Sequence, residues 1–225
     1  MTLHTYPELV QGTDEWLAAR RGIVTASIVG QLITPSTIRP ANNDKSRALT
    51  TLLVAERITG WSDPVYVSDD MMRGTLDEPI ARAKYAEHYA PVTELGFMVL
   101  DEPWGRLGYS PDGLVGDEGL IEIKSRRAKT QLATILRDEV PAENMAQIQA
   151  GLLVSGRQWC DYVSFCGGMP LYVRRVHADQ RWFDAIVAAV TNFETTAAEM
   201  VAAYTTATAG RPATERIDHF QEASL

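Results

Sequence analysis

The sequence predicts an α+β (mixed α/β) domain in which helices flank a central, mostly antiparallel or mixed β-sheet. Three observations lead to this prediction. The first 90 or so residues have helical periodicity, residues 92–124 alternate as strands do, and the chain closes with two further strands and a long helix. Because strands and helices do not alternate regularly, a repeating βαβ fold is excluded.

Two short helices and a loop begin the chain. Thr13 is a suitable N-cap for a helix that stops near Gly22. A second helix begins at Thr25 or Ser27 and runs to about residue 33. The segment 34–44 (TPSTIRPANND) is rich in proline and asparagine, which predicts a mobile loop.

Two longer helices follow the loop. The first covers residues 44–59, and the second covers residues 76–89, where Pro79 is tolerated in a first turn. Met71 and Met72 precede the second helix, and we expect them to pack in the core. The apolar side of the first helix is formed by Leu49, Leu52, Leu53 and Ile58.

The second half of the chain supplies the sheet and the closing helix. Strands are predicted at 92–100, 106–110, 120–124, 159–165 and 171–176, and helices at 130–137, 141–154 and 180 to about 204. No repeat or long linker interrupts this order. We therefore expect a single domain over residues 1–205, followed by a flexible tail at 206–225.

The composition indicates a cytoplasmic protein without membrane spans. The chain has 225 residues, of which 45% are hydrophobic, enough for one sizeable core. Its apolar runs are too short to cross a bilayer, and residues 1–12 lack the order of a secretory signal. Cys160 and Cys166 are expected to be reduced thiols, and the scattered histidines do not form a zinc motif.

The net charge of -8 argues at first against a nucleic-acid partner, because phosphates favour a basic surface. Net charge does not describe a local groove, however, and a carboxylate-rich metal site itself adds negative charge. The overall charge therefore leaves a DNA-binding function open.

The segment Ser110-Pro111-Asp112-Gly113, followed by Glu122 and Lys124, is the most informative in the chain. Each half has a structural interpretation by itself. Ser-Pro-Asp-Gly favours a turn, and Glu122 and Lys124 alternate with isoleucines as on any half-exposed strand.

Together the two halves predict a metal site. Antiparallel strands joined by a turn can place Asp112 beside Glu122, and strand alternation puts Glu122 and Lys124 on one face. Converging carboxylates repel each other unless a cation lies between them. Oxygen ligands favour Mg²⁺ or Mn²⁺, and a neighbouring lysine is suited to hold or deprotonate an attacking water.

Asp112, Glu122 and Lys124 resemble the motif of the PD-(D/E)xK nucleases, and more of the chain is similar to the lambda exonuclease (YqaJ-like viral recombinase) family. The resemblance covers roughly residues 8–176, whereas the 34–44 loop and the C-terminal helix match no family motif. The family motifs occur in this order: Trp16-Leu-Ala-Ala-Arg20-Arg-Gly22, Thr25-Ala-Ser27, Gly74-x-x-x-Glu78, Ser110-Pro-Asp-Gly-Leu114, Glu122-Ile-Lys124 and Met145-Ala-Gln147-Ile-Gln149.

The resemblance implies a restriction-endonuclease-like core and a Mg²⁺-dependent exonuclease acting on double-stranded DNA. Such an enzyme works from the 5′ end, releases mononucleotides and leaves a 3′ single strand for recombination. The family also implies a homotrimeric ring, one or two Mg²⁺ ions per active site, and an annealing protein for single strands as a partner.

The resemblance also assigns roles to individual residues. Asp112 and Glu122 would bind the metal, with the backbone carbonyl of Ile123 and the carboxylate of Glu78 as further ligands. Gln147 would reach the active site from a helix. By structural criteria alone, Glu78 is an acidic residue in a first helical turn, and Gln147 lies on the polar side of an amphipathic helix.

A phosphate pocket and a basic segment complete the implied site. The residues that match a pocket for the 5′-terminal phosphate are Arg20, Thr25, Ser27 and Ser110. Arg126 and Arg127 lie in the densest basic run and would follow the DNA backbone, although a basic run is also typical of a solvated face.

Two other functions remain compatible with the sequence. A PD-(D/E)xK endonuclease would share Asp112, Glu122 and Lys124 but would not need a 5′-phosphate pocket. A non-catalytic DNA-binding relative is the second alternative, although such relatives typically lose the lysine or a carboxylate. A small-molecule enzyme is poorly supported, because neither a glycine-rich phosphate loop nor a nucleophile elbow is present.

Overall fold

The computed structural model describes residues 2–64 and 67–217. Its helices are α1 (Asp14–Arg20), α2 (Ala26–Val29), the 3-10 turn η1 (Gly30–Leu32), α3 (Asp44–Thr59), α4 (Asp69–His88), α5 (Ala128–Arg137), α6 (Ala142–Ser155) and α7 (Gln180–Thr208). Its strands are β1 (Thr2–Tyr6), β2 (Val24–Thr25), β3 (Ile33–Thr34), β4 (Arg39–Pro40), β5 (Phe97–Glu102), β6 (Gly105–Tyr109), β7 (Gly113–Val115), β8 (Gly119–Ser125), β9 (Trp159–Phe165) and β10 (Tyr172–His177).

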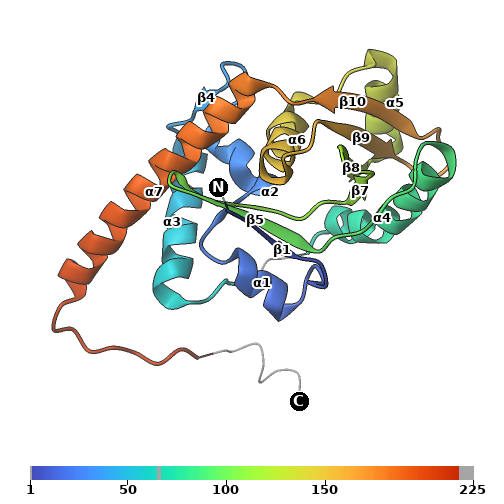
Figure 1. The fold of residues 1–225 in the computed structure, drawn as a ribbon. Coiled ribbons are helices and arrows are strands. Elements are labelled where there is room, and N and C mark those ends of the chain that lie inside the picture. The colour runs from blue at the N-terminus through green and yellow to red at the C-terminus, as the bar shows by residue number, and fades with distance from the viewer. Residues whose placement is uncertain (1, 65–66, 218–225) are drawn as a thin grey trace.

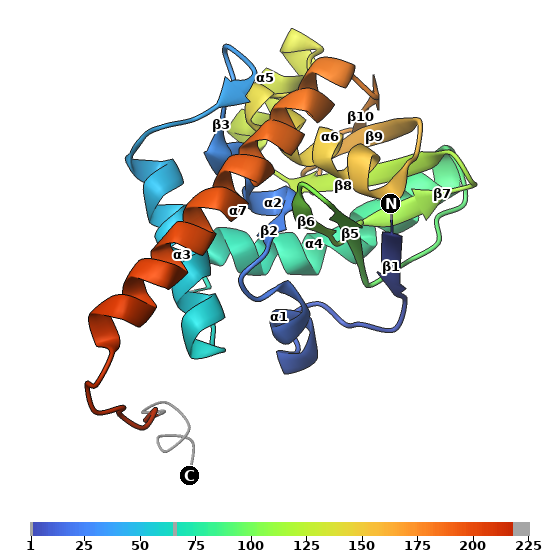
Figure 2. The same ribbon diagram turned by 60° about the vertical axis from the view of Figure 1, so that its left-hand side comes forward.

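Two four-stranded sheets carry the fold, with the strand orders β1-β5-β6-β2 and β10-β9-β8-β7 (Figures 1 and 2). The pairs β2–β6 and β8–β9 are parallel, and the other pairs in these sheets are antiparallel. The predicted mixed sheet flanked by helices is therefore confirmed, but it is divided in two. The short segment 110–112 connects β6 of one sheet to β7 of the other.

Helices cover both faces of β8, so this strand is buried almost throughout. Ile121 and Ile123 pack in a cluster with Tyr85 of α4, whereas Leu120, on the other face, belongs to the main core with Ile148 of α6. Burying a strand on both faces withdraws even its polar side chains from water. Glu122 and Lys124 lie on the Leu120 face, and this places them towards α6.

Helix α7 lies beside α3 and α6, and its C-terminal part extends beyond the body of the molecule (Figure 1). The helix is longer than predicted and continues to Thr208. Threonine hydroxyls near its end donate to carbonyls one turn earlier, as Thr205 does to Val201, so these side chains are satisfied within the helix. Residues 218–225 of the predicted tail lie outside the described residues. Within the described part, no helix is both long and apolar enough to span a membrane.

Helix α4 is the largest correction to the predicted elements. It begins at Asp69 rather than residue 76, because the Ser68 side chain accepts the backbone N–H of Met71 as an N-cap. Pro79 therefore lies inside the helix and not in its first turn. Met71 and Met72 are 51% and 56% exposed, so their predicted core packing is wrong.

Two smaller predictions also differ from the structure. The 34–44 segment is not a plain loop, since Ile33–Thr34 and Arg39–Pro40 pair as an antiparallel hairpin. Leu52 was expected on the apolar side of α3 but is 49% exposed. Thr50 and Val54 take the buried positions instead, because the neighbouring elements meet α3 along a stripe rotated from the predicted one.

Strand β1 was not predicted, and Gly96 holds the loop after it in place. A Cβ at Gly96 would overlap the carbonyl oxygen of Leu9 and lie 2.8 Å from its carbonyl carbon. Since these are backbone atoms, we expect Gly96→Ala to cost about 2 kcal/mol and to lower the thermal midpoint by several degrees. Gly167→Ala, which would meet open space, is the matched control. Equal midpoints for the two variants would contradict this packing.

Candidate active site

The β7–β8 hairpin brings the predicted catalytic carboxylates together. Gly113 pairs with Ile121, so Asp112, one residue before β7, lies next to Glu122. Oδ2 of Asp112 accepts the backbone N–H of Ile123 at 2.6 Å. This hydrogen bond fixes the carboxylate at the edge of β8, beside the backbone of the residue that was predicted to supply a carbonyl ligand.

Lys124 joins the carboxylates to helix α6. Its Nζ lies 2.7 Å from Oε1 of Glu122 and donates to Oε1 of Gln147 at 3.0 Å. The structure therefore brings Gln147 to the same point as Glu122 and Lys124. Burial lowers the pKa of Lys124, but the charges of Glu122 and Asp112 outweigh it and hold the pKa above its usual value. The side chain is thus an ammonium that compensates the carboxylates.

Glu78 reaches the site from α4 but is engaged by Arg82, one turn further along the helix. The two side chains form an ion pair, and Arg82 also donates from Nε to the backbone carbonyl of Asp112 at 2.7 Å. Burial raises the pKa of Glu78, Arg82 lowers it and the charge of Glu122 raises it again, with a net increase. The structure therefore places Glu78 close enough to Glu122 for their charges to interact.

Arg82 was not among the predicted site residues. It contacts Glu78, the Asp112 backbone and also Glu94, whose Oε2 lies 2.7 Å from its Nη1. Its i,i+4 spacing from Glu78 is the signal that could have found it, but such pairs are common on helix surfaces. Only the fold shows that this pair lies beside Asp112.

Glu122 is buried and Asp112 is half-buried, and the repulsion between their carboxylates is a cost that a cation would relieve. Glu122 is 1% exposed, and within the described residues neither of its side-chain oxygens has a hydrogen bond of good geometry, although the Lys124 ammonium is near one of them. Burial, and then the charges of Glu122 and Glu78, raise the pKa of Asp112 well above its ordinary value. A divalent cation between Asp112 and Glu122 would remove this repulsion.

The donor set fits a small, hard cation that keeps part of its water shell. Within residues 2–64 and 67–217, no three acidic, histidine or cysteine side chains are grouped as a metal site. Mg²⁺ does not require three, because it is commonly bound through one or two carboxylates with water as the remaining ligands. Asp112 and Glu122 can supply these carboxylates, whereas Glu78 would have to leave Arg82 to join them.

The side chains predicted to bind a 5′-phosphate also lie together. Arg20 donates from Nη2 to the hydroxyls of Thr25 and Ser27, each at 3.3 Å, and these hydroxyls are 3.1 Å apart. Trp16 connects this group to Ser110: the Arg20 guanidinium lies 3.8 Å from its ring centroid, and its Nε1 donates to the Ser110 hydroxyl at 3.0 Å. Ser110 is two residues before Asp112, so the cluster adjoins the carboxylates.

Arg20 is suited to an anionic ligand. Within the described residues its guanidinium forms no ion pair with a carboxylate, although it is half-buried. Burial lowers the pKa of Arg20 to about 10, and the charge of Glu56 raises it against this effect. A phosphate would complete the hydrogen bonding of the guanidinium and stabilise its charge.

The arginines of the predicted basic segment are less available for contacts with DNA than the sequence indicates. Arg126 donates to Asn144 at 2.7 Å and to the Tyr162 hydroxyl at 3.2 Å, and its side chain is only 19% exposed. Arg127 is exposed but lies 2.8 Å from the carboxylate of Asp70. A role for Arg126 and Arg127 along the DNA backbone therefore stays a prediction.

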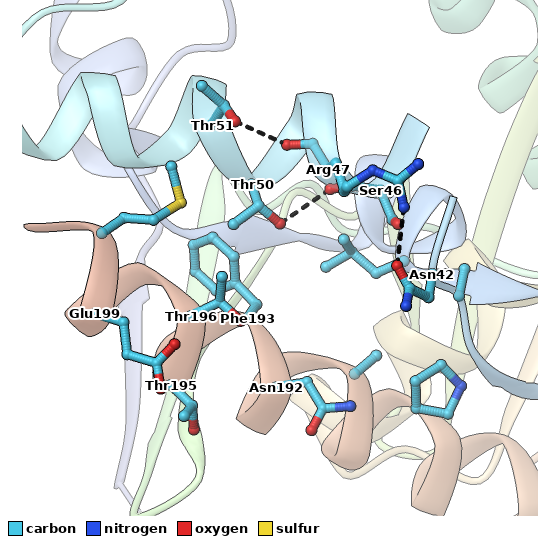
Figure 3. Close-up of a pocket in the computed structure, with 15 residues that line it drawn as sticks. Asn42, Ser46, Arg47, Thr50, Thr51, Asn192, Phe193, Thr195, Thr196 and Glu199 are labelled. Carbon is cyan, nitrogen blue, oxygen red and sulfur yellow. Dashed lines mark hydrogen bonds between the residues drawn. The ribbon is translucent and has the colours of Figure 1, made fainter. Parts of the chain in front are cut away.

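A cavity of about 660 Å³ lies between α3 and α7, away from the carboxylates (Figure 3). On the α3 side its polar side chains are already bonded: Thr50 donates to the Ser46 carbonyl at 2.9 Å, Thr51 to the Arg47 carbonyl at 3.0 Å, and Arg47 to Asn42 at 2.9 Å. Helix α7 contributes Asn192, Phe193, Thr195, Thr196 and Glu199. The carboxylate cluster, rather than this cavity, is therefore the candidate active site.

Comparison with known families identifies the chain. Residues 15–158 match the family model of the YqaJ-like viral recombinase domain, which is more than half of the sequence. No curated protein matched.

Solved structures agree with the family match. An alkaline exonuclease (LHK-Exo) from Laribacter hongkongensis is 34% identical, with a TM-score of 0.78 over 88% of this chain and 98% of that one. Its complex with dAMP gives 35% identity and a TM-score of 0.77 over the same shares of the two chains. A phage related exonuclease from Haemophilus somnus 129PT has 12% identity and a TM-score of 0.59 over 81% of this chain and 96% of its own, a likeness of fold alone.

Proposed function

Because this chain belongs to the YqaJ-like viral recombinase family, we propose that it is a divalent-metal-dependent exonuclease acting on double-stranded DNA. The observation that carries the proposal is the cluster of Asp112, Glu122 and Lys124, in which a buried and a half-buried carboxylate lie side by side against one ammonium. Such an arrangement is costly to folding, and the cost is explained if the site holds a cation and a phosphate.

Each residue of the cluster has a distinct part in phosphodiester hydrolysis. Asp112, Glu122 and the Ile123 carbonyl would hold Mg²⁺ or Mn²⁺, one ion or two, with Glu78 as a further ligand. When bound, the metal would supply Lewis-acid stabilisation of the scissile phosphate and would make an attacking water more acidic. Lys124, held by Glu122 and Gln147, orients that water and stabilises the charge that develops on phosphorus-bound oxygens.

The cluster of Arg20, Thr25, Ser27 and Ser110 supports a 5′-to-3′ direction. A guanidinium and several hydroxyls are suited to a terminal phosphate, and Ser110 is two residues from Asp112. A 5′-phosphate bound there would place a phosphodiester near the carboxylates, so the product would be a mononucleotide. A relative that is 35% identical was crystallised in complex with dAMP, a nucleoside monophosphate, which agrees with this product.

Family membership supports several further parts of the proposal. Residues 1–205 would form one nuclease domain that assembles as a homotrimeric ring on DNA. The 3′ single strand would pass to an annealing protein during recombination. A viral recombinase acts on DNA inside its host, so the place of action would be the bacterial cytoplasm.

The experiment that tests the function compares linear and closed circular duplex DNA. Purified protein is incubated with each substrate in Mg²⁺ or in EDTA. We expect Mg²⁺-dependent release of mononucleotides from the linear DNA, faster from 5′-phosphorylated than from 5′-hydroxyl ends, while the circle stays intact.

The other outcomes separate the alternatives. Cleavage of the closed circle would assign a PD-(D/E)xK endonuclease with the same carboxylates. DNA binding without cleavage of either substrate would assign a non-catalytic relative. Equal rates at 5′-phosphate and 5′-hydroxyl ends would remove the phosphate pocket from the proposal but leave the metal site.

A further inference from the structure

The turn at Gly22 connects two of the segments that form the proposed 5′-phosphate pocket. Arg20 lies just before this turn, and Thr25 lies just after it. Gly22 has a φ of 66°, and a Cβ there would come within 2.5 Å of Cγ of Arg57. The backbone of the turn is therefore held close against α3, and its conformation sets how Arg20 and Thr25 face each other.

Two neighbouring side chains of α3 hold both polar groups of Gly22. Oε2 of Glu56 accepts the Gly22 N–H at 2.8 Å, and Nε of Arg57 donates to the Gly22 carbonyl at 2.6 Å. A peptide turn whose N–H and carbonyl are both hydrogen-bonded to charged side chains has little freedom to rotate. Glu56 is also the carboxylate whose charge acts on Arg20.

Glu194 of α7 fixes Arg57 in turn. The guanidinium forms two parallel hydrogen bonds to the Glu194 carboxylate, of 2.7 and 2.8 Å, and lies over the ring of Phe193 at 4.9 Å. The side chains of Arg57 and Glu194 are 25% and 27% exposed, so water screens their attraction only in part. A bidentate pair also fixes the orientation of the Arg57 plane, which a single bond would not do.

Glu194 contacts the second segment of the pocket as well. A Cβ at Gly105, in the turn between β5 and β6, would lie 2.8 Å from Cγ of Glu194. From this turn β6 runs to Tyr109 and leads directly to Ser110, and β6 pairs with β2 through Gly108 and Thr25. One carboxylate of α7 thus touches the start of the strand that delivers Ser110 and, through Arg57, the turn that delivers Arg20.

We propose that Glu56, Arg57 and Glu194, here called the Gly22 clamp, are positioning residues that set the geometry of the pocket for a 5′-terminal phosphate. The inference rests on the proposed function of that pocket. Arg57 and Glu194 do not touch the phosphate themselves; they hold the Gly22 turn so that the Arg20 guanidinium and the hydroxyls of Thr25 and Ser27 converge.

The clamp makes α7 part of the nuclease unit. Glu194 lies outside residues 15–158, the segment that matches the family, and α7 matches no family motif in the sequence. Its role follows from contacts between residues that are 137 positions apart in the chain. Selection for 5′-phosphorylated ends would therefore depend on a helix that the family pattern does not include.

The test measures how strongly the full chain prefers 5′-phosphorylated over 5′-hydroxyl duplex ends. Glu194→Gln keeps the size of the side chain and removes its charge, and Arg57→Lys keeps the charge and removes the fork. Each should lower the ratio of kcat/KM values about tenfold, because a misaligned charged hydrogen bond loses on the order of one decade of affinity. The loss should appear as a higher KM for phosphorylated ends. Arg20→Gln, which removes the guanidinium of the pocket itself, should change KM in the same direction.

Two controls separate positioning from general stability. Arg174→Gln, on β10, breaks an exposed ion pair of 3.1 Å to Asp138 at the end of α5 and should leave the ratio unchanged. Thermal midpoints of all variants show whether they are folded. Fluorescence anisotropy in EDTA compares binding to the two kinds of end without cleavage, so the inference is tested even if the chain cuts no DNA.

The outcomes distinguish this inference from the function on which it rests. If the wild type does not discriminate between the ends, the phosphate pocket is wrong and the clamp has no such role. If the wild type and Arg20→Gln differ but the two clamp variants keep the wild-type ratio, the clamp is structural only and this inference alone is overturned. Equal losses at both kinds of end would also overturn it.

Discussion

Asp112→Asn should reduce DNA cleavage by about a thousandfold or more while it makes the metal-free protein more stable. The carboxylate is half-buried near Glu122 and Glu78, and its raised pKa reflects the loss of solvation and their repulsion. An asparagine keeps an oxygen for the Ile123 N–H but removes one of the charges. A gain of about 1 kcal/mol would raise the thermal midpoint in EDTA by roughly 2–4 °C in a chain of this size.

Addition of Mg²⁺ should reverse the order of thermal stability, so that the wild type becomes more stable than Asp112→Asn. Binding to the folded wild type at a hundredfold excess over Kd stabilises it by about 2.7 kcal/mol, and the variant should gain much less. Differential scanning fluorimetry with and without Mg²⁺ measures both effects. Asp117→Asn, an exposed acid in the β7–β8 turn, is the matched control. If Asp112→Asn retained more than a few per cent of wild-type cleavage, the assignment of the site would be wrong.

The second large effect is expected for Lys124→Met, which should lower kcat by about a hundredfold, the loss typical of one transition-state donor. Methionine has a similar length but no charge, so it loses the contacts to Glu122 and Gln147. Binding of DNA ends in EDTA should change little by comparison, because the proposed 5′-phosphate pocket is formed by other residues. Single-turnover cleavage and equilibrium binding measure the two quantities separately.

Lys84→Met is the appropriate control for this variant. Lys84 is an exposed lysine of α4 that pairs with Glu87 at 2.7 Å and lies outside the site. The Lys84→Met variant should cleave DNA at the wild-type rate. A Lys124→Met enzyme as fast as Lys84→Met would show that the ammonium only balances the buried carboxylates and does not act on the phosphate.

Several elements could be predicted because their signals are local. Helix α3 has the predicted bounds, since the sequence around Asn43 and Gly60 caps it at both ends. Strand β9 also has the predicted bounds. Helix α4 was predicted too short because Gly74 and Pro79 weaken helical propensity, whereas an N-cap at Ser68 and packing of the helix against β8 stabilise it.

Elements that depend on distant partners were missed. Strand β1 has exposed side chains throughout and no alternation that favours a strand; it forms because its backbone pairs with β5. Met71 and Met72 read as core residues, but among the described residues about half of each remains exposed on α4. A local pattern cannot show which face of a helix the rest of the chain will cover.

The sequence by itself determined that Asp112, Glu122 and Lys124 share one site, because a short hairpin and the two-residue period of a strand leave little choice. The contact of Gln147 with Lys124, the pairing of Glu78 with Arg82 beside Asp112, and the clamp from Arg57 to Glu194 were decided only by the tertiary structure. Each of these depends on how helices pack against β8 or against one another. Spacing along the chain does not encode that packing, since many other residues have the same spacing and never meet.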